Sequence, residues 1–315
     1  MSKKISDQKI LQVGSIPPPF GGVRVHVKRL NENLINSGVN SRLYAKPFDL
    51  LFHDVWHIHL SNAYKRILIT ILSKFLYKKT VITLHRNFNR DEGIKNYINN
   101  LSFKLANRLI FLNDESFSYF KDKYPNKAYQ VSAFIPPTSG EESKYPLKSE
   151  DYKTIKEKQG KFTLSCTNAH HLRFFNEEDI YGIVEIVKSI KRKEDSFLII
   201  SDPSGEYYSY ISKKLVIPEN ILFICYNHSF LNVLKLCDVY LRNTNTDGDS
   251  LSIHEALYFG LKVYCTNVVS RPKNVIVYKR GSLSDKIETY DSLSNSYEPV
   301  EAISDIINIY RSLVK

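Results

Sequence analysis

Short apolar runs alternate with longer amphipathic stretches along the first 140 residues. The run "KILQVG" predicts a first strand, and after a Pro/Gly loop "VRVHVKRLNENLINSG" predicts a helix that ends at Gly38. Four apolar side chains share one face of that helix: Val23, Val27, Leu30 and Leu34. Further strands are predicted at "SRLYA", "DVWHIHL", "TVITLH", "RLIFLN" and "AYQVSAFI". This alternation is typical of a doubly wound parallel sheet.

The alternation stops at "PPTSGEESKYPLKSEDYKTIKEKQG", which is rich in turn formers and reads as a connection between domains. It then restarts with "KFTLSCT", a helix near 178–191, "SFLIIS", a helix near 207–215, "ILFICY", "SFLNVLKLCD", "VYLRN" and "KVYCTN". We therefore expect two Rossmann-like α/β domains, 1–140 and 141–315, that face a cleft. A last helix at about 297–313 is a candidate to pack back on the first domain. Ligands of such sheets bind beyond the carboxyl ends of the strands.

Composition narrows the class of protein. None of the apolar runs in the 315 residues approaches the roughly 18 residues of a membrane-spanning helix. The start "MSKKISDQKILQVG" has no signal-peptide pattern, and the four cysteines show no metal or disulfide spacing. We expect a soluble cytoplasmic protein.

The positive charge belongs to the first domain. Residues 1–140 carry 21 Lys and Arg against 9 Asp and Glu, a net +12, whereas residues 141–315 carry 23 against 24, a net −1. A basic half suggests an acidic partner: a nucleic acid, an anionic membrane surface or a phosphorylated substrate. Nucleic acid is the weakest of these, because no RNA- or DNA-binding signature is present and the cations are scattered. We interpret "AYKRILITILSKFLYKK" as a packed helix with solvated lysines.

Glycines and histidines at the ends of predicted strands could bind a ligand. Gly21 and Gly22 precede a helix and could seat a phosphate, or they form a plain turn. His59 and His85 end two strands, where an imidazole can hydrogen-bond a hydroxyl or phosphate or can be a satisfied polar residue. The pair in "HIH" has no third metal ligand that the sequence makes evident.

The stretch "TDGDSLSIHEALYFG" (246–260) crowds polar residues before an apolar helix. A capping box formed by Ser252 and Glu255 could explain those two residues, with Asp247 in the turn. A metal-binding Asp-x-Asp would use Asp247 and Asp249. The motif lies late in a two-domain chain, which argues against the metal. A third interpretation is a clamp on a sugar nucleotide.

Asp247 and Glu255, with seven residues between them and followed by "ALYFGLKVYCTN", resemble the E-x7-E region of family 4 retaining glycosyltransferases with the GT-B fold. "GGVRVHVKRLNENLINSG", "DVWHIH" and "TVITLH" resemble that family's glycine loop and its His-bearing strand ends. These matches follow the family's order over nearly the whole chain.

The resemblance implies a donor site. Gly21 and Gly22 would approach the donor diphosphate, and backbone amides of Ser250, Leu251 and Ser252 would bind phosphate or sugar. Glu255 would bind the ribose, Asp247 would hold a sugar hydroxyl, and His85 would line the reaction centre. Asp249 would also bind the donor, and His59 would lie on the acceptor side.

Two departures from the family pattern stand out. The first acid is Asp rather than Glu, and the usual Arg and Lys are not obvious in the phosphate-binding segment 165–182. Arg173 and Arg242 could replace them, or both could be surface arginines. The gap leaves room for a non-catalytic copy.

The resulting prediction is a retaining, metal-independent transferase. It would move a sugar from a nucleoside diphosphate, UDP rather than GDP, to a glycan or lipid-linked glycan in surface polysaccharide or lipopolysaccharide synthesis. The alternatives are a UDP-sugar 2-epimerase and a non-catalytic partner that binds a sugar nucleotide or glycan. Peripheral association with an anionic membrane surface is expected through the basic domain.

Overall fold

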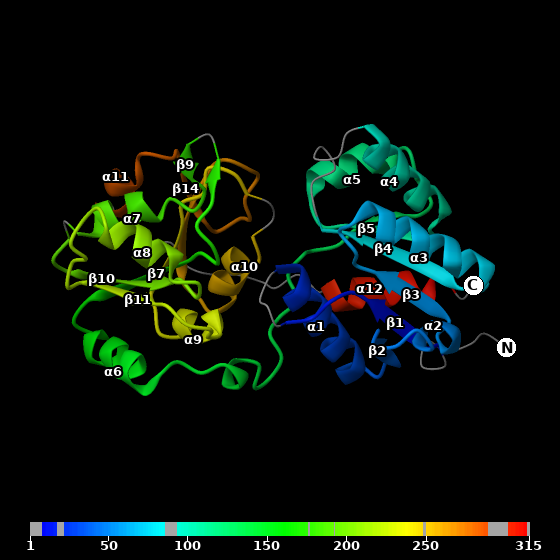
Figure 1. Ribbon diagram of the computed structural model, residues 1–315, viewed down its shortest axis with the longest axis horizontal. Helices are drawn as coiled ribbons and strands as arrows, with labels where there is room; N and C mark the ends of the chain where they lie inside the picture. Colours follow the sequence, from blue (N-terminus) through cyan, green and yellow to red (C-terminus); the bar gives the residue numbers. More distant parts are fainter. Residues whose placement is uncertain are drawn as a thin grey trace. The chain divides into compact units, whose positions relative to one another are not determined.

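The computed structural model describes residues 8–17, 22–85, 93–175, 177–191, 193–247, 250–288 and 302–313. The chain divides into two compact units (Figure 1). Unit 1 comprises residues 1–138 and 300–315, and unit 2 comprises residues 139–299. Among the described residues, no helix combines the length and apolarity needed to cross a membrane.

Unit 1 contains a six-stranded parallel sheet in the order β2-β1-β3-β4-β5-β6. Its strands are β1 (Ile10–Val13), β2 (Ser41–Leu43), β3 (Val55–Ile58), β4 (Lys79–Leu84), β5 (Arg108–Phe111) and β6 (Ala128–Gln130). Its helices are α1 (Gly22–Asn36), α2 (Asp49–Phe52), α3 (Ala63–Phe75), α4 (Gly93–Leu105), α5 (Asp114–Lys121) and α12 (Ala302–Arg311). The strands pair parallel because a helix connects most of them across a face of the sheet.

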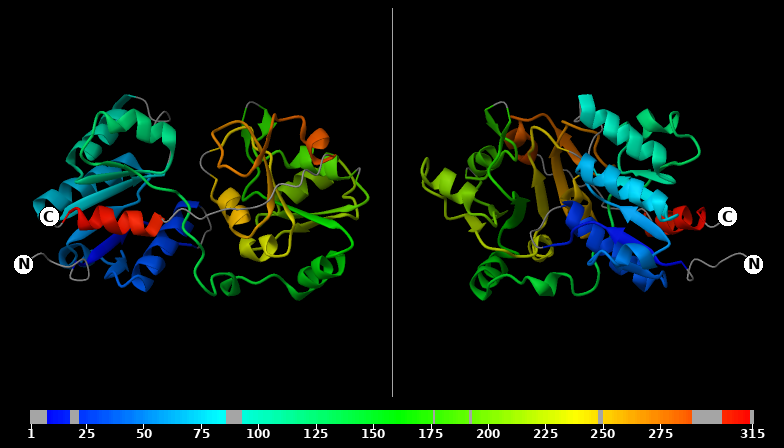
Figure 2. Two further views of the ribbon diagram at one scale, coloured as in Figure 1. Left: turned by 180° about the vertical axis from the view of Figure 1, so that it is seen from behind. Right: turned by 45° about the vertical axis from the view of Figure 1, so that its right-hand side comes forward.

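Successive side chains of the strands in unit 1 feed two separate cores. Ile10 packs with the apolar side of α1, whereas Leu11 packs on the opposite face with Phe103 of α4. Helix α12 (red in Figure 2) lies with α1 (blue) on one face of this sheet. Its Ile306 and Tyr310 are buried in the same core as Ile10. The end of the chain therefore completes the core of the domain in which the chain begins.

Unit 2 repeats the architecture with the strand order β11-β10-β7-β12-β13-β14. Its strands are β7 (Thr163–Asn168), β10 (Ser196–Ser201), β11 (Ile221–Ile224), β12 (Val239–Arg242), β13 (Lys262–Thr266) and β14 (Ile276–Tyr278). A two-stranded hairpin, β8 (Phe174–Phe175) and β9 (Glu178–Asp179), follows β7. The helices are η3 (Glu142–Lys144), α6 (Ser149–Lys158), α7 (Ile183–Ile190), α8 (Glu206–Ser212), α9 (Phe230–Leu234), α10 (Leu251–Tyr258) and α11 (Leu283–Glu288). The predicted pair of doubly wound α/β domains is confirmed.

The predicted helix near 178–191 is wrong at its start, because residues 178–179 form β9 and α7 begins at Ile183. Gly182 precedes the helix with φ 63°, a left-handed conformation that other residues rarely adopt. A Cβ atom at Gly182 would lie 2.3 Å from the carbonyl oxygen of Asn243. This close approach requires glycine and fixes the point at which the helix begins.

Candidate functional site

The first group of polar residues lies at the carboxyl ends of β1, β3 and β4 in unit 1. The chain builds β2 on one side of β1 and β3 on the other, so the topological switch point lies between β1 and β3. Gln12 comes from β1, His57 from β3, and His59 and His85 directly follow β3 and β4. Helix α1 contributes His26. These five residues occupy the place where sheets of this class bind their ligands.

Gly14, directly after β1, permits this packing. A Cβ atom at this position would lie 3.1 Å from Cβ of His59 and 3.1 Å from a methyl group of Val27. Such contacts are tighter than ordinary van der Waals contacts, so a larger residue would push the strand end and α1 apart. Gly14 is the last residue of the predicted first strand. A glycine at a strand end was the feature of the sequence that could have indicated this close packing.

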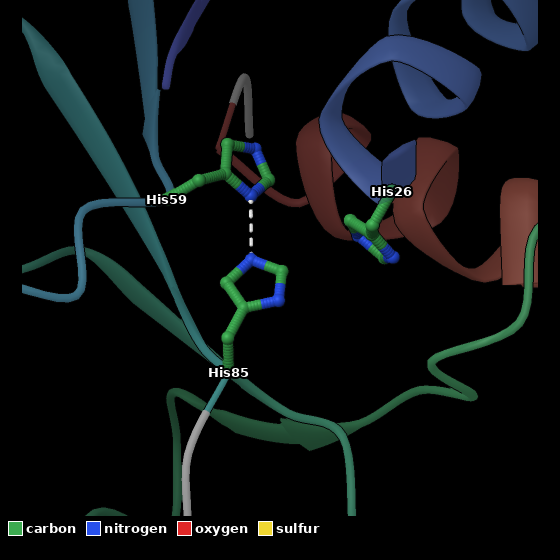
Figure 3. Close-up of side chains that lie close together, drawn as sticks. All are labelled: His26, His59 and His85. Atoms are coloured by element: carbon green, nitrogen blue, oxygen red, sulfur yellow. Dashed lines mark hydrogen bonds between the residues drawn. The ribbon is translucent and has the colours of Figure 1, made fainter. Parts of the chain in front are cut away.

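The protonation of His59 follows from its partners. The amide nitrogen of Gln12 donates to the hydroxyls of Ser41 and Tyr310, at 3.2 Å each. Its Oε1 atom is therefore the acceptor for the Nε2 proton of His59, 3.0 Å away. The lone pair on Nδ1 of His59 then accepts a hydrogen bond from Nε2 of His85 at 3.1 Å (Figure 3). Neutral His85 is left with a lone pair on Nδ1.

His26 is oriented in the same way. Its Nδ1 atom donates to the carbonyl oxygen of Ala133 at 3.0 Å, which leaves a lone pair on Nε2. His57, behind the group, contacts the Tyr310 hydroxyl at 2.7 Å and the Thr83 hydroxyl at 2.6 Å. Fixed hydrogen bonds thus orient the imidazoles so that Nε2 of His26 and Nδ1 of His85 can act as acceptors.

Burial keeps these imidazoles neutral. Desolvation lowers the pKa of His26 to about 4, although its hydrogen bond to Ala133 acts in the opposite direction. Desolvation, reinforced by the charge of His26, lowers the pKa of His57 to about 3. The pKa values of His59 and His85 lie well below 6.5, first because of desolvation and then because of neighbouring histidines. All four imidazoles are neutral at pH 7, and the lone pairs on Nε2 of His26 and Nδ1 of His85 remain as acceptors for hydroxyl groups.

Three of these residues could also hold a metal ion. One ring nitrogen from each of His26, His59 and His85 lies within 4.8 Å of the others. Figure 3 shows the three side chains converging from α1, β3 and β4. His26 and His59 have second hydrogen bonds, to a carbonyl and an amide, as Zn²⁺-binding imidazoles do, and an ion would replace the hydrogen bond between His59 and His85. The sequence did not make a third ligand evident, because His26 lies on a distant helix rather than beside "HIH".

The second group of polar residues lies at the switch point of unit 2, between β7 and β12. Tyr240 of β12 donates to Oδ1 of Asn168, the last residue of β7, at 2.8 Å. The same hydroxyl lies 2.8 Å from the hydroxyl of Ser252 in α10. The first turn of α10 is therefore fastened to the carboxyl ends of the two central strands.

The capping-box interpretation is wrong for this helix. Ser250 is the N-cap, with an extended backbone, and its carbonyl accepts from the amide of Ile253 at 3.0 Å. Ser252 already lies inside α10, so it does not cap the helix, and Glu255 is too far along to complete a box. Glu255 is instead buried in the second turn. The N–H groups at the start of the helix, which precede the regular i to i−4 hydrogen bonds, begin at Leu251.

Asp247, just before α10, lies between two arginines. Arg242 approaches its carboxylate with two nitrogens, Nε at 3.0 Å and Nη2 at 2.9 Å. Arg271 donates to the same carboxylate at 2.9 Å. All three side chains are at least 88% buried, the most exposed being Arg242 at 12%. A bidentate, charge-assisted pair of this kind is strong and geometrically specific.

Two cations around one carboxylate leave one positive charge in excess. Burial alone would raise the pKa of Asp247, but Arg242 and Arg271 outweigh it and lower the pKa to about 2. The excess charge lies close in sequence to the amino end of α10, where the helix dipole is also positive. This combination suits a phosphate group.

The other predicted donor residues are less enclosed. Arg173 lies in the loop between β7 and β8 and its side chain is exposed, as expected of a surface arginine. Gly22 is the first residue of α1, with open space beside its Cα atom. Gly21 and Asp249 lie outside the described residues. Arg271 was missed by the sequence analysis because it follows β13, far from the motif.

No protein-family model and no curated protein matches the sequence. HepE from Anabaena, solved with UDP and glucose, is 12% identical with a TM-score of 0.65 and covers 98% of this chain and 94% of its own. A glycosyltransferase from Rickettsia africae is 14% identical with a TM-score of 0.61, covering 98% and 93%. UDP-GlcNAc 2-epimerase from Methanocaldococcus jannaschii is 11% identical with a TM-score of 0.65, covering 96% and 99%. This likeness establishes the fold as GT-B, with two Rossmann-like domains.

Proposed function

We propose that this protein is a retaining glycosyltransferase that uses a nucleoside diphosphate sugar, with UDP favoured. The observation that carries the proposal is the start of α10, where Arg242 and Arg271 place excess positive charge around Asp247 at the switch point of unit 2. A leaving diphosphate develops negative charge, and a helix end with fixed cations stabilises it. HepE, of the same fold, was solved with UDP and glucose.

The donor would bind along the first turns of α10. In this proposal the amides of Ser250, Leu251 and Ser252 bind phosphate, and Glu255 accepts hydrogen bonds from the ribose. Asp247 positions the two arginines, since both of its oxygens already accept from guanidinium groups. If Asp247 also holds a sugar hydroxyl, as the sequence analysis predicts, its carboxylate accepts that bond in addition to those from the two arginines. No metal ion is needed in this scheme.

The histidines of unit 1 would serve the reacting sugar and the acceptor. His85 presents a neutral imidazole acceptor for a sugar hydroxyl, and His59 fixes its orientation through their hydrogen bond. Retention follows if leaving group and acceptor occupy one face of the sugar, with the departing phosphate taking the acceptor proton. No protein nucleophile enters this scheme.

A thermal-shift series with UDP, GDP, ADP and CMP tests the donor site. A ligand that binds only the folded state stabilises it by about 2.7 kcal/mol at 100 times its Kd. We expect the largest shift with UDP. If none of the four nucleotides raises the melting temperature, the proposal is overturned. A labelled UDP-sugar should then yield a glycosylated product in the presence of glycan acceptors.

A second candidate is a UDP-sugar 2-epimerase. The observation in its favour is that UDP-GlcNAc 2-epimerase has the same fold over 96% of this chain. Recovery of a rearranged sugar without an acceptor would establish the epimerase. UDP binding with neither rearrangement nor transfer would instead favour a non-catalytic binding partner, although Arg271 supplies a cation that the sequence pattern lacked.

We further propose a glycan or lipid-linked glycan acceptor, a role in surface polysaccharide or lipopolysaccharide synthesis, and a cytoplasmic location with peripheral membrane association. The net +12 of residues 1–140 supports an anionic partner. The acceptor would then carry phosphate or lie at the membrane surface.

A further inference from the structure

Helix α3 of unit 1 packs Ile69 and Leu72 against the core and also exposes a second apolar face. Tyr64, Leu68 and Phe75 are 52%, 66% and 76% exposed. Together with Ile71, which is also exposed, they are spaced so that they share one helical face. Arg66 and Thr70 are at most 1% exposed. The sequence-based interpretation of a packed helix with solvated lysines therefore misses the outward apolar face.

Polar contacts hold α3 in this orientation. The Arg66 guanidinium donates to the carbonyl of Leu60 at 2.9 Å and to the side chain of Asn99 in α4, and it lies 5.5 Å from the centroid of the Phe103 ring. Helices α3 and α4 run side by side in unit 1 (Figure 1). Rotating α3 to bury its outward face would break these bonds and withdraw Ile69 and Leu72 from the core. The outward face is thus a fixed property of the fold.

Helix α2 extends the apolar surface. Phe48, Leu51 and Phe52 are 70%, 48% and 65% exposed. The Lys78 ammonium, just beyond α3, donates to the carbonyl of Leu51 at 2.7 Å and joins the two segments. Tyr77 is 95% exposed with φ 54°, a conformation rare for a bulky residue. We call these apolar residues of α2 and of α3 through Tyr77 the α2–α3 face.

The charges beside the α2–α3 face indicate what covers it. The segment from Ala63 to Lys79 contains no Asp or Glu. Its Lys65 and Lys79 are exposed, whereas Lys74 and Lys78 donate hydrogen bonds within unit 1. Protein–protein interfaces are depleted in lysine at their centre. Lysines beside Phe, Tyr and Leu are typical of helices that lie in the interface of an anionic bilayer. Charge and side-chain type therefore favour a lipid surface over a second protein.

We propose that the α2–α3 face docks on the surface of an anionic lipid bilayer. Phe48, Phe52, Leu68 and Phe75 would enter the headgroup region, while the exposed Lys65 and Lys79 contact lipid phosphates. Aromatic side chains are favoured at this depth of a bilayer. The proposal deepens the membrane association proposed above and would hold unit 1 at the surface where a lipid-linked acceptor lies.

Co-sedimentation with vesicles tests this proposal. We expect the protein to bind vesicles of equal parts phosphatidylcholine and phosphatidylglycerol, and to bind phosphatidylcholine alone much less. The double variant Leu68→Asp and Phe75→Asp should bind at least about tenfold more weakly, because it removes two apolar anchors. Val216→Asp, which changes an 88% exposed apolar residue of unit 2, should leave binding unchanged.

UDP-induced thermal shifts on the same samples separate the two proposals. Lost vesicle binding with an unchanged UDP shift in the double variant supports the docking face. No binding of the parent protein to phosphatidylglycerol vesicles, or equal binding by the double variant, overturns it. A parent dimer that the double variant dissociates, without vesicle binding, also overturns it and assigns the face to a second copy. Vesicle binding without any UDP shift supports this proposal and removes only the donor site.

Discussion

The two candidate sites sit at equivalent switch points of similar sheets but use opposite electrostatics. In unit 1, buried histidines are held neutral by desolvation, with pKa values such as about 4 for His26. In unit 2, Asp247 stays ionised because Arg242 and Arg271 surround it. Burial of titratable groups is thus tolerated in two ways: by loss of charge or by pairing of charge.

This difference also separates overall charge from site charge. The basic half of the chain has a neutral site, whereas the nearly neutral half has a cationic one. The positive charge of unit 1 therefore lies on its lysines and arginines and not in its histidine site. We infer that the net charge of residues 1–140 indicates what binds the surface of that half. The ion pairs of Asp247 with Arg242 and Arg271 instead indicate what binds the site in unit 2.

Removing the carboxylate of unit 2 should give the largest effect. Asp247→Asn would leave two buried guanidinium groups without their counter-charge, and breaking a buried pair costs about 3–5 kcal/mol. We expect a loss of this size in the free energy of unfolding, measured by urea titration, with loss of the UDP-induced shift. An Asn variant of parental stability that has lost only turnover would return Asp247 to direct contact with the sugar.

Glu255→Gln should act on affinity and not on folding. Glutamine preserves the shape of the buried side chain, but charge-assisted bonds are roughly twice as strong as neutral ones. We expect UDP affinity, measured by calorimetry, to fall about tenfold, since a loss near 1.4 kcal/mol is one factor of ten. As a matched control, Glu206→Gln on α8 should bind UDP normally. Unchanged UDP affinity in Glu255→Gln would remove the ribose contact.

Acid should distinguish the two sites by the pH at which stability is lost. The folded pKa of His26 is about 4 and that of His57 about 3, below the unfolded value of 6.5. The unfolded chain therefore binds more protons below pH 6.5, and stability falls by up to about 1.4 kcal/mol per pH unit for each such histidine. Asp247, lowered from 3.8 to about 2, contributes only at more acidic pH.

Thermal unfolding between pH 8 and pH 5 measures this slope. His57→Gln should flatten it relative to the parent protein, because one group that takes up a proton on unfolding is lost. His171→Gln, which changes a partly exposed histidine of unit 2, serves as the control. An identical slope in the parent and in His57→Gln would contradict neutral burial of that imidazole.

The smallest effect is expected from chelation, because the proposed transfer needs no metal ion. EDTA should leave turnover of a UDP-sugar unchanged within error. Restoration of lost turnover by manganese would point to Asp247 and Asp249, of which Asp249 lies outside the described residues. Restoration by zinc, abolished in His26→Gln, would assign a working metal to the histidines of unit 1.

The sequence determined the alternation of strands and helices, and through it the two parallel sheets; the GT-B fold was implied only by the resemblance of its motifs to a known family. This was possible because hydrophobic periodicity is local and buried parallel strands read as short apolar runs. The ends of those runs also marked His59, His85 and Arg242 as candidates, since strands of one sheet present their carboxyl ends at one edge.

Only the tertiary structure decided the partners of these residues. Arg271 reaches Asp247 from 24 positions away, and His26 joins His59 from another element, so neither pairing leaves a periodic trace. The outward apolar face of α3 likewise depends on Arg66 contacting α4, a choice that a helical wheel does not contain. Charge pairing, desolvation and helix orientation are properties of atoms brought together in space, whereas periodicity reports only on neighbours along the chain.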